Sequence, residues 1–153
     1  SIRVYVKKGK KIKIDKSVHQ LIKEELNYGM DDFKTYQKFA DKVYKIRENV
    51  IKNISNLRNK GEKIIGFGAP AKATTALNFF GISNQIDFIV EDNKLKHKKF
   101  IPGVKIPIHS KEKIKDINNT MLVLAWNFFD DIKKNNKALS KNFINIKSLE
   151  KES

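Results

Sequence analysis

Residues 63–75 have the sequence KIIGFGAPAKATT, in which an apolar run leads directly into two glycines, a proline and a lysine. The apolar run at 63–67 predicts a buried strand. Proline is favoured in the first turn of a helix, where its missing N–H group costs nothing, so Pro70 predicts a helix over 70–80. Gly81 then provides the stop of that helix. The stretch therefore predicts a strand, a tight turn and a helix in direct succession.

The same alternation of strands and helices continues along the rest of the chain. Further strands are predicted at 86–90, 103–108, 120–126 and 142–146, with short helices capped by Ser110 and by Asn127 between them. The helix after Ser110 is expected to reach residue 117, and the helix after Asn127 to reach residue 136. Solid apolar strands that alternate with helices are typical of a parallel sheet covered on both faces. We therefore predict an α/β fold with a Rossmann-like domain over residues 62–148.

The first 61 residues have a different texture and predict one strand segment and two helices. Residues 2–14 alternate apolar and polar side chains around a Lys-Lys-Gly-Lys turn, which predicts a hairpin or a strand with a tail. Ser17 and Gln20 have the spacing of a capping box and predict a helix over 18–28. Asp31 or Asp32 is expected to cap the helix that follows. We therefore expect a terminal strand segment at 1–14 and a helical connector at 15–61.

The second predicted helix is unusually long and carries one apolar stripe. Apolar and aromatic side chains recur every three or four residues from position 33 to Gly61, which indicates a helix that faces a core. Such a stripe is long for one small domain, so part of it is expected to brace a neighbouring domain. The stripe consists of Phe33, Tyr36, Phe39, Val43, Ile46, Val50, Ile54 and Leu57.

Composition narrows the classes of function. The chain has 153 residues, 40% of them apolar, and it has no cysteine, which excludes disulfides and thiolate metal sites. No apolar run approaches the 20 or so residues of a membrane span, and we expect a cytoplasmic protein. The chain starts without methionine and already in strand-like alternation, which suggests a fragment of something longer.

The net charge of +15 raises the hypothesis of a nucleic-acid partner. Only three of the 32 basic residues are arginine, the side chain that base edges and phosphates favour, and the lysines are scattered over the whole length. The charge therefore favours a solvated surface over specific nucleic-acid binding.

The turn after the first Rossmann strand fits a phosphate-binding pattern. GFGAPA matches G-x-G-x-x-G/A, in which Gly66 would permit the tight turn and Gly68 a close approach of the ligand. The helix start favours an anion, and Lys72 would add a positive charge beside it. Glu91 and Asp92 follow the next strand, where dinucleotide folds place an acid on the ribose hydroxyls. The alternative is that the glycines merely make a strand-to-helix turn.

Two further segments belong to the same predicted edge of the sheet. Residues 93–103, NKLKHKKFIPG, are either a loop that gathers phosphate or an exposed lysine-rich loop. Trp126 ends a strand and is either core or a wall of the site, while Asn127 is most simply a helix cap. No catalytic constellation and no metal site stands out, and the histidines are not assigned as bases. They are His19, His97 and His109.

Four stretches in order resemble one known family. GFGAPAK (66–72), LNFFGI (77–82), the segment 90–108 and LAWN (124–127) are similar to the C-terminal domain of S-adenosylmethionine-dependent sugar C-methyltransferases. SIRVYV at the start resembles a strand of the preceding methyltransferase domain of that family. The resemblance covers almost the whole chain.

The resemblance implies that separate domains bind the cofactor and the substrate. Such enzymes have an N-terminal zinc-binding segment, a central domain that binds S-adenosylmethionine, and a Rossmann-like C-terminal domain that closes the cleft for a nucleotide-linked deoxysugar. This chain corresponds to the last part. The resemblance therefore implies that the chain holds no cofactor, has no catalytic residue and is inactive alone. Its partners would be the nucleotide sugar and the central domain.

The resemblance also assigns site residues. The substrate-side positions it implies, together with the acid predicted above, are Gly66, Gly68, Ala69, Pro70, Ala71, Lys72, Glu91, Asn93, Lys96, Trp126 and Asn127. Pro102 and Gly103 match the family pattern as well. The chain departs from it at Ala73-Thr74, where the family has Gly-Asn, and at Lys94, His97 and Lys98, where it has Pro, Gln and Gly.

Two other hypotheses stay open from the residues alone. One is a stand-alone module that binds a nucleotide or NAD(P), which the glycine pattern and Glu91 support. The other is a nucleic-acid binder, which only the net charge supports. A strand at residues 2–6 without its neighbour would also be able to pair with a second copy of the chain.

Overall fold

The computed structural model describes residues 2–9 and 13–151. The chain divides into two compact units, one that runs to Lys42 and one that begins at Val43. The division falls inside a single long helix. Each unit is described by itself below.

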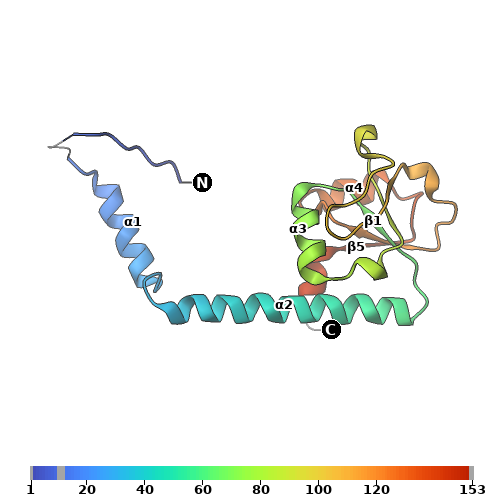
Figure 1. Ribbon diagram of the computed structural model, residues 1–153, viewed down its shortest axis with the longest axis horizontal. Helices are drawn as coiled ribbons and strands as arrows, with labels where there is room; N and C mark the ends of the chain where they lie inside the picture. The colour runs from blue at the N-terminus through green and yellow to red at the C-terminus, as the bar shows by residue number, and fades with distance from the viewer. Residues whose placement is uncertain (1, 10–12, 152–153) are drawn as a thin grey trace. The chain divides into compact units, whose positions relative to one another are not determined.

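The unit from Val43 onward is built on a five-stranded parallel sheet (Figure 1). The strands are β1 (Ile64–Phe67), β2 (Phe88–Val90), β3 (Ile108–His109), β4 (Thr120–Val123) and β5 (Asn142–Asn145). Their order across the sheet is β3-β2-β1-β4-β5. This order, with the reversal between β1 and β4, is that of a Rossmann-like domain, so the predicted fold class is confirmed.

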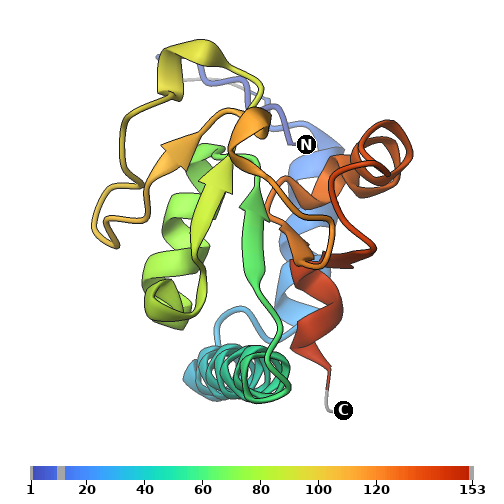
Figure 2. The same ribbon diagram turned by 90° about the vertical axis from the view of Figure 1, so that its right-hand side faces the viewer.

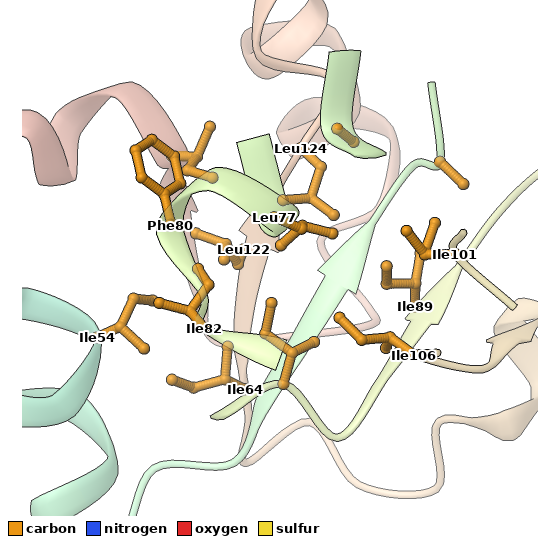
Figure 3. Close-up of a cluster of buried hydrophobic side chains, with 14 of the residues drawn as sticks. Ile54, Ile64, Leu77, Phe80, Ile82, Ile89, Ile101, Ile106, Leu122 and Leu124 are labelled. Carbon is orange, nitrogen blue, oxygen red and sulfur yellow. The ribbon is translucent and has the colours of Figure 1, made fainter. Parts of the chain in front are cut away.

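Side chains that alternate along β1, the central strand, pack into two separate hydrophobic clusters. Ile64 belongs to the larger cluster, which side chains of α2 (Phe33–Asn59) and α3 (Ala71–Phe80) complete. Figure 3 shows Ile54 of α2, Leu77 of α3 and Leu122 of β4 gathered around it. Ile65 and Phe67 lie in the second cluster, against α4 (Phe129–Asn135). The sheet is thus covered on both faces, as Figure 2 shows, which explains why its strands are apolar without alternation.

The described residues contain five short 3-10 helices, and two of these helices show that a prediction was wrong. The helix expected after Ser110 is only the turn η3, and Asn127 lies inside the turn η4 instead of capping α4. α4 begins two residues later and has Phe128 at its cap position, without a side-chain hydrogen bond. The turns are η1 (Ser83–Gln85), η2 (Lys94–Lys96), η3 (Lys111–Lys113), η4 (Trp126–Phe128) and η5 (Ile146–Glu150).

The first unit contains α1 (Lys16–Asn27) and the start of α2, and its cap differs from the prediction. Asp15 is the cap of α1, because its carboxylate accepts from the Ser17 N–H group at 2.9 Å and from the Ser17 hydroxyl at 2.6 Å. Asp32 caps α2 as expected, since it accepts from the Lys34 N–H group at 2.9 Å.

The predicted N-terminal strand is wrong for the residues that can be assessed. Residues 2–9, 13 and 14 form no strand, and Ile2, Val4 and Val6 are exposed. Alternation is not sufficient for a strand, because the backbone groups also need a neighbouring strand to bond with. The rest of the expected hairpin, residues 10–12, lies outside the described residues.

The apolar stripe of α2 is used over only part of its length. Val50 and Ile54 are fully buried in the larger core. Phe33, Tyr36 and Phe39 lie on the first unit and are exposed, Phe33 by 72% of its surface. Among residues 2–9 and 13–151, no helix is both long and apolar enough to cross a membrane.

Replacing Gly66 by alanine is expected to destabilise the second unit. Gly66 is buried within β1, and a Cβ there would lie 2.7 Å from Cγ1 of Ile89 and 3.2 Å from Cδ1 of Leu124. Crowding of this kind costs about 1–3 kcal/mol, so thermal unfolding should shift down by roughly 3–9 °C. Thr75→Ala, on the exposed side of α3, is the control. Equal melting temperatures for the two variants would contradict the packing argument.

Candidate functional site

The segments that follow β1 and β4 meet at the carboxyl edge of the sheet. Because the strand order reverses between these neighbouring strands, their outgoing connections diverge here, and ligands of open α/β sheets bind at this point. Gly68 has a φ of +87°, and a Cβ on it would lie 3.1 Å from the Cβ of Ala125. Gly68 is therefore the residue that makes the turn and lets the two segments touch. Gly66, expected in the turn, lies inside β1 and serves packing.

Glu91 connects the end of β2 to the glycine turn. Its Oε2 accepts from the Ala69 N–H group at 2.8 Å, and its Oε1 accepts from the Asn93 N–H group at 3.0 Å. Lys96 completes the arrangement, because its ammonium lies 3.4 Å from Oε2 of Glu91 and donates to the Ala69 carbonyl at 3.0 Å. We call these four residues the Glu91 network. The carboxylate is turned toward the protein's own backbone, so the Ala69 N–H group already has an anionic acceptor.

The Glu91 network sets the charge state of its carboxyl group. Burial raises the pKa of Glu91, since its side chain is only 14% exposed. The N–H groups of Asn93 and Ala69 and the Lys96 ammonium lower it, and together they outweigh the burial. The pKa of Glu91 therefore lies below its usual value, and the carboxylate is ionised near neutral pH.

The basic loop after β2 is folded back on this network. His97 Nε2 lies 2.7 Å from the Glu91 carbonyl oxygen, and the Asn93 side chain accepts from the Leu95 N–H group at 3.0 Å. Lys98 has a φ of +60° and donates its N–H group to the Ile108 carbonyl at 2.9 Å. The segment is thus an ordered turn with a partly buried Lys96, while its remaining lysines are exposed.

The Pro102-Gly103 turn docks onto α3. Asn78 donates to the Pro102 carbonyl at 2.9 Å and to the Thr74 carbonyl at 2.8 Å. Gly103 has a φ of +84°, and a Cβ on it would overlap the Asn78 side chain. Only glycine fits at 103, because both the backbone conformation and the close approach exclude a side chain.

The start of α3 brings Lys72 to Trp126. The Lys72 ammonium lies 4.2 Å from the centre of the Trp126 ring, a cation–π distance. The N–H groups of Ala73 and Thr74 are bonded to the Pro70 carbonyl. Those of Ala71 and Lys72 have no partner among the described residues, as expected at a helix start.

The structure thus sorts the predicted site residues into two groups. Gly68, Ala69, Glu91, Asn93 and Lys96 form the frame, and Pro70 and Ala71 carry it into α3. Lys72 and Trp126 face each other at the carboxyl edge, and Asn127 is exposed beside them.

Sequence reasoning missed two residues of this edge. Asn78 was part of a quoted motif but received no role, although it holds the Pro102-Gly103 turn. Lys147 comes after β5, and its ammonium lies 6.0 Å from the centre of the Trp126 ring. No motif signals Lys147, and only the position of β5 beside β4 brings it near.

The chain matches a family of protein domains described as the C-methyltransferase C-terminal domain, over residues 1–145. It belongs to this family. The C-methyltransferase NovU of Streptomyces niveus is 30% identical over 128 residues, which are 82% of this chain and 30% of that protein. The chain therefore spans about a third of the length of this C-methyltransferase. The resemblance to the C-methyltransferase family is confirmed, while the roles assigned to individual residues stay predictions.

The acid after β2 that binds a ribose in dinucleotide folds is engaged within this protein, because both oxygens of Glu91 accept hydrogen bonds from backbone N–H groups. In residues 2–9 and 13–151, no group of three or more histidine or acidic side chains is placed to hold a metal ion.

Glu91→Gln is expected to loosen the Glu91 network and to change how stability depends on pH. The amide keeps the shape but loses the charge and one acceptor, which costs about 1–3 kcal/mol at pH 7. Because the pKa of Glu91 is lowered in the folded state, its contribution is complete above the unfolded value of about 4.3 and is lost as the pH falls through the folded value. The difference in the free energy of unfolding between wild type and variant should therefore become smaller at acidic pH. Urea unfolding at several pH values would measure this. The exposed Glu25→Gln is the control, and a pH-independent difference would contradict the prediction.

Lys98→Gly is expected to stabilise the protein. The left-handed conformation of Lys98 is strained for any residue with a Cβ, whereas glycine adopts it freely. After the entropy cost of glycine, we expect a gain of about 0.5–1 kcal/mol and a melting temperature roughly 1–4 °C higher. Lys99→Gly removes the same charge at a neighbouring position without positive φ and should destabilise. A similar effect of both substitutions would show that charge, and not backbone strain, is responsible.

Proposed function

We propose that this chain is the substrate-side domain of an S-adenosylmethionine-dependent C-methyltransferase that acts on a nucleotide-linked deoxysugar. The observation that carries the proposal is the carboxyl edge of a C-methyltransferase C-terminal domain at which Lys72 meets Trp126. A lysine beside an aromatic ring, at the point where the strand order reverses, suits a ligand with a phosphate and a flat base. Lys72, Trp126 and Asn127 would contact the substrate, and the Glu91 network would hold the turn that presents them.

Two of the groups that could move a proton at this edge, Glu91 and His97, are already engaged. Methyl transfer to a sugar carbon needs a base that removes a proton beside a carbonyl group. The Glu91 carboxylate is bonded to backbone N–H groups, and His97 is bonded to the Glu91 carbonyl. This supports a chain that binds substrate but transfers no methyl group by itself. S-adenosylmethionine would then be bound by another domain of a longer protein, in the cytoplasm.

An exposed apolar surface on the first unit supports a partner domain. Val18, Ile22 and Leu26 follow one another at four-residue intervals on α1, and all three are exposed. Phe33 and Phe39 add two exposed aromatic rings on α2. The four-residue spacing puts the three α1 side chains on one face, and exposed apolar surface of this kind marks interaction sites. We assign this surface to the central S-adenosylmethionine domain.

A stand-alone NAD(P)-binding module is the second candidate. It is favoured by the strand order and by the left-handed Gly68 in a G-x-G-x-x-A turn. The inward orientation of Glu91 speaks against it, because the acid that would hold the ribose is part of the frame.

A thermal-shift comparison distinguishes these functions. The chain would be heated with dTDP-glucose, with S-adenosylmethionine and with NADH. A ligand at 100 times its Kd adds about 2.7 kcal/mol, which is roughly 5–10 °C for a chain of this size. We expect a shift with dTDP-glucose alone, and no methyl transfer when the chain is given S-adenosylmethionine and a keto-sugar nucleotide.

Each other outcome contradicts part of the proposal. A shift with NADH would favour the NAD(P) module, and a shift with S-adenosylmethionine would place the methyl donor on this chain. A methylated product would show that the chain is active alone. If dTDP-glucose causes no shift, the isolated chain does not bind the substrate.

A further inference from the structure

Trp126 has two lysines near its ring, and they come from different parts of the fold. The ammonium groups of Lys72 and Lys147 lie 4.2 Å and 6.0 Å from the centre of its ring. Lys72 is in the first turn of α3, Trp126 in η4 and Lys147 in η5. These segments follow β1, β4 and β5, which are adjacent strands, so the sheet itself holds the three side chains together.

Among the described residues, Lys72 and Lys147 have no acidic partner. Ion pairs near this edge join Lys96 to Glu91 and Lys111 to Asp92, but in the part of the chain that the structure describes none includes Lys72 or Lys147. Two like charges beside one half-buried ring repel each other, and an anion would relieve that repulsion. The positive charge at the ring is therefore available to a ligand.

The backbone of the glycine turn is a poorer place for the same anion. The Gly68 N–H group donates to the Val90 carbonyl at 2.8 Å, and the Ala69 N–H group donates to Glu91. A phosphate placed there would also face the Glu91 carboxylate. The positive charges that could bind a phosphate are thus those of Lys72 and Lys147, near the Trp126 ring.

We infer that Lys72, Trp126 and Lys147 form a subsite for a nucleoside diphosphate. The base would stack on the Trp126 ring, and the two lysines would bind the diphosphate. In the free protein a lysine covers the ring, and its flexible stem lets the ammonium move to a phosphate when the base takes its place. The inference rests on the proposed function, since the nucleoside diphosphate is the part that all nucleotide-linked sugars of one kind share.

Trp126 makes the subsite directly measurable, because it is the only tryptophan in the chain. The chain would be titrated with dTDP and UDP, and separately with thymidine and orthophosphate, while tryptophan fluorescence is followed. We expect a saturable change with a nucleoside diphosphate and at least about tenfold weaker binding of either half. Lys72→Ala and Lys147→Ala should each raise the Kd about tenfold, as loss of a charged contact does. Lys137→Ala, an exposed lysine with the same change of charge, should leave it unchanged.

Calorimetry with the same ligands separates the possible failures. Binding of dTDP without a change in Trp126 fluorescence, or without an effect of the two lysine substitutions, would place the nucleotide elsewhere and overturn the subsite but not the proposed function. Orthophosphate that binds as tightly as dTDP would reduce it to an anion site, and a thymidine oligonucleotide that binds far more tightly would indicate nucleic acid. If neither dTDP nor dTDP-glucose binds, the subsite and the substrate-binding role of the chain fail together.

Discussion

The hydrogen bond between the Glu91 carboxylate and the Ala69 N–H group fixes the carboxyl edge of this domain. It joins the turn after β1 to the end of β2, and the Lys96 ammonium connects the same two segments through the Ala69 carbonyl. A largely buried carboxylate is tolerable only because it accepts two backbone hydrogen bonds and faces a cation. The basic loop, the Pro102-Gly103 turn and the start of α3 are then arranged around that ionised group.

This arrangement separates the residues that build the edge from those that remain available at it. A G-x-G-x-x-A turn in a dinucleotide fold offers its backbone to a pyrophosphate. Here the same turn is bonded internally, so the family motifs around Gly68, Glu91 and Lys96 act mainly as a scaffold. The side chains left at the edge are Lys72, Trp126 and Lys147. A phosphate-binding pattern therefore identifies the right edge of the sheet without identifying the groups that would bind.

The parts of this structure that sequence predicts are those that local patterns determine. Solid apolar runs separated by helical segments gave the parallel sheet, and Pro70 and Gly81 marked both ends of α3 to within a residue. The direction of the Glu91 side chain and the approach of Lys147 depend on which strands are neighbours, which no local pattern contains. The strand predicted at residues 2–6 failed for the same reason, since alternation describes a strand's faces but not its partner. Asn127 was misassigned because an intervening 3-10 turn delays the start of α4.

Three of the departures from the family pattern, Ala73, His97 and Lys98, fall on the scaffold. The side chain of Ala73, at a position where the resemblance implies glycine, is fully buried in the larger core. His97 contacts the Glu91 carbonyl, and Lys98 keeps a left-handed backbone where the resemblance implies glycine. That strain persists because hydrogen bonds on both sides of Lys98 fix the loop. Substitutions in the scaffold that preserve its geometry do not change the side chains that a substrate would contact. Under the proposed function, specificity for one sugar would therefore depend on exposed residues around Trp126 and on the partner domain.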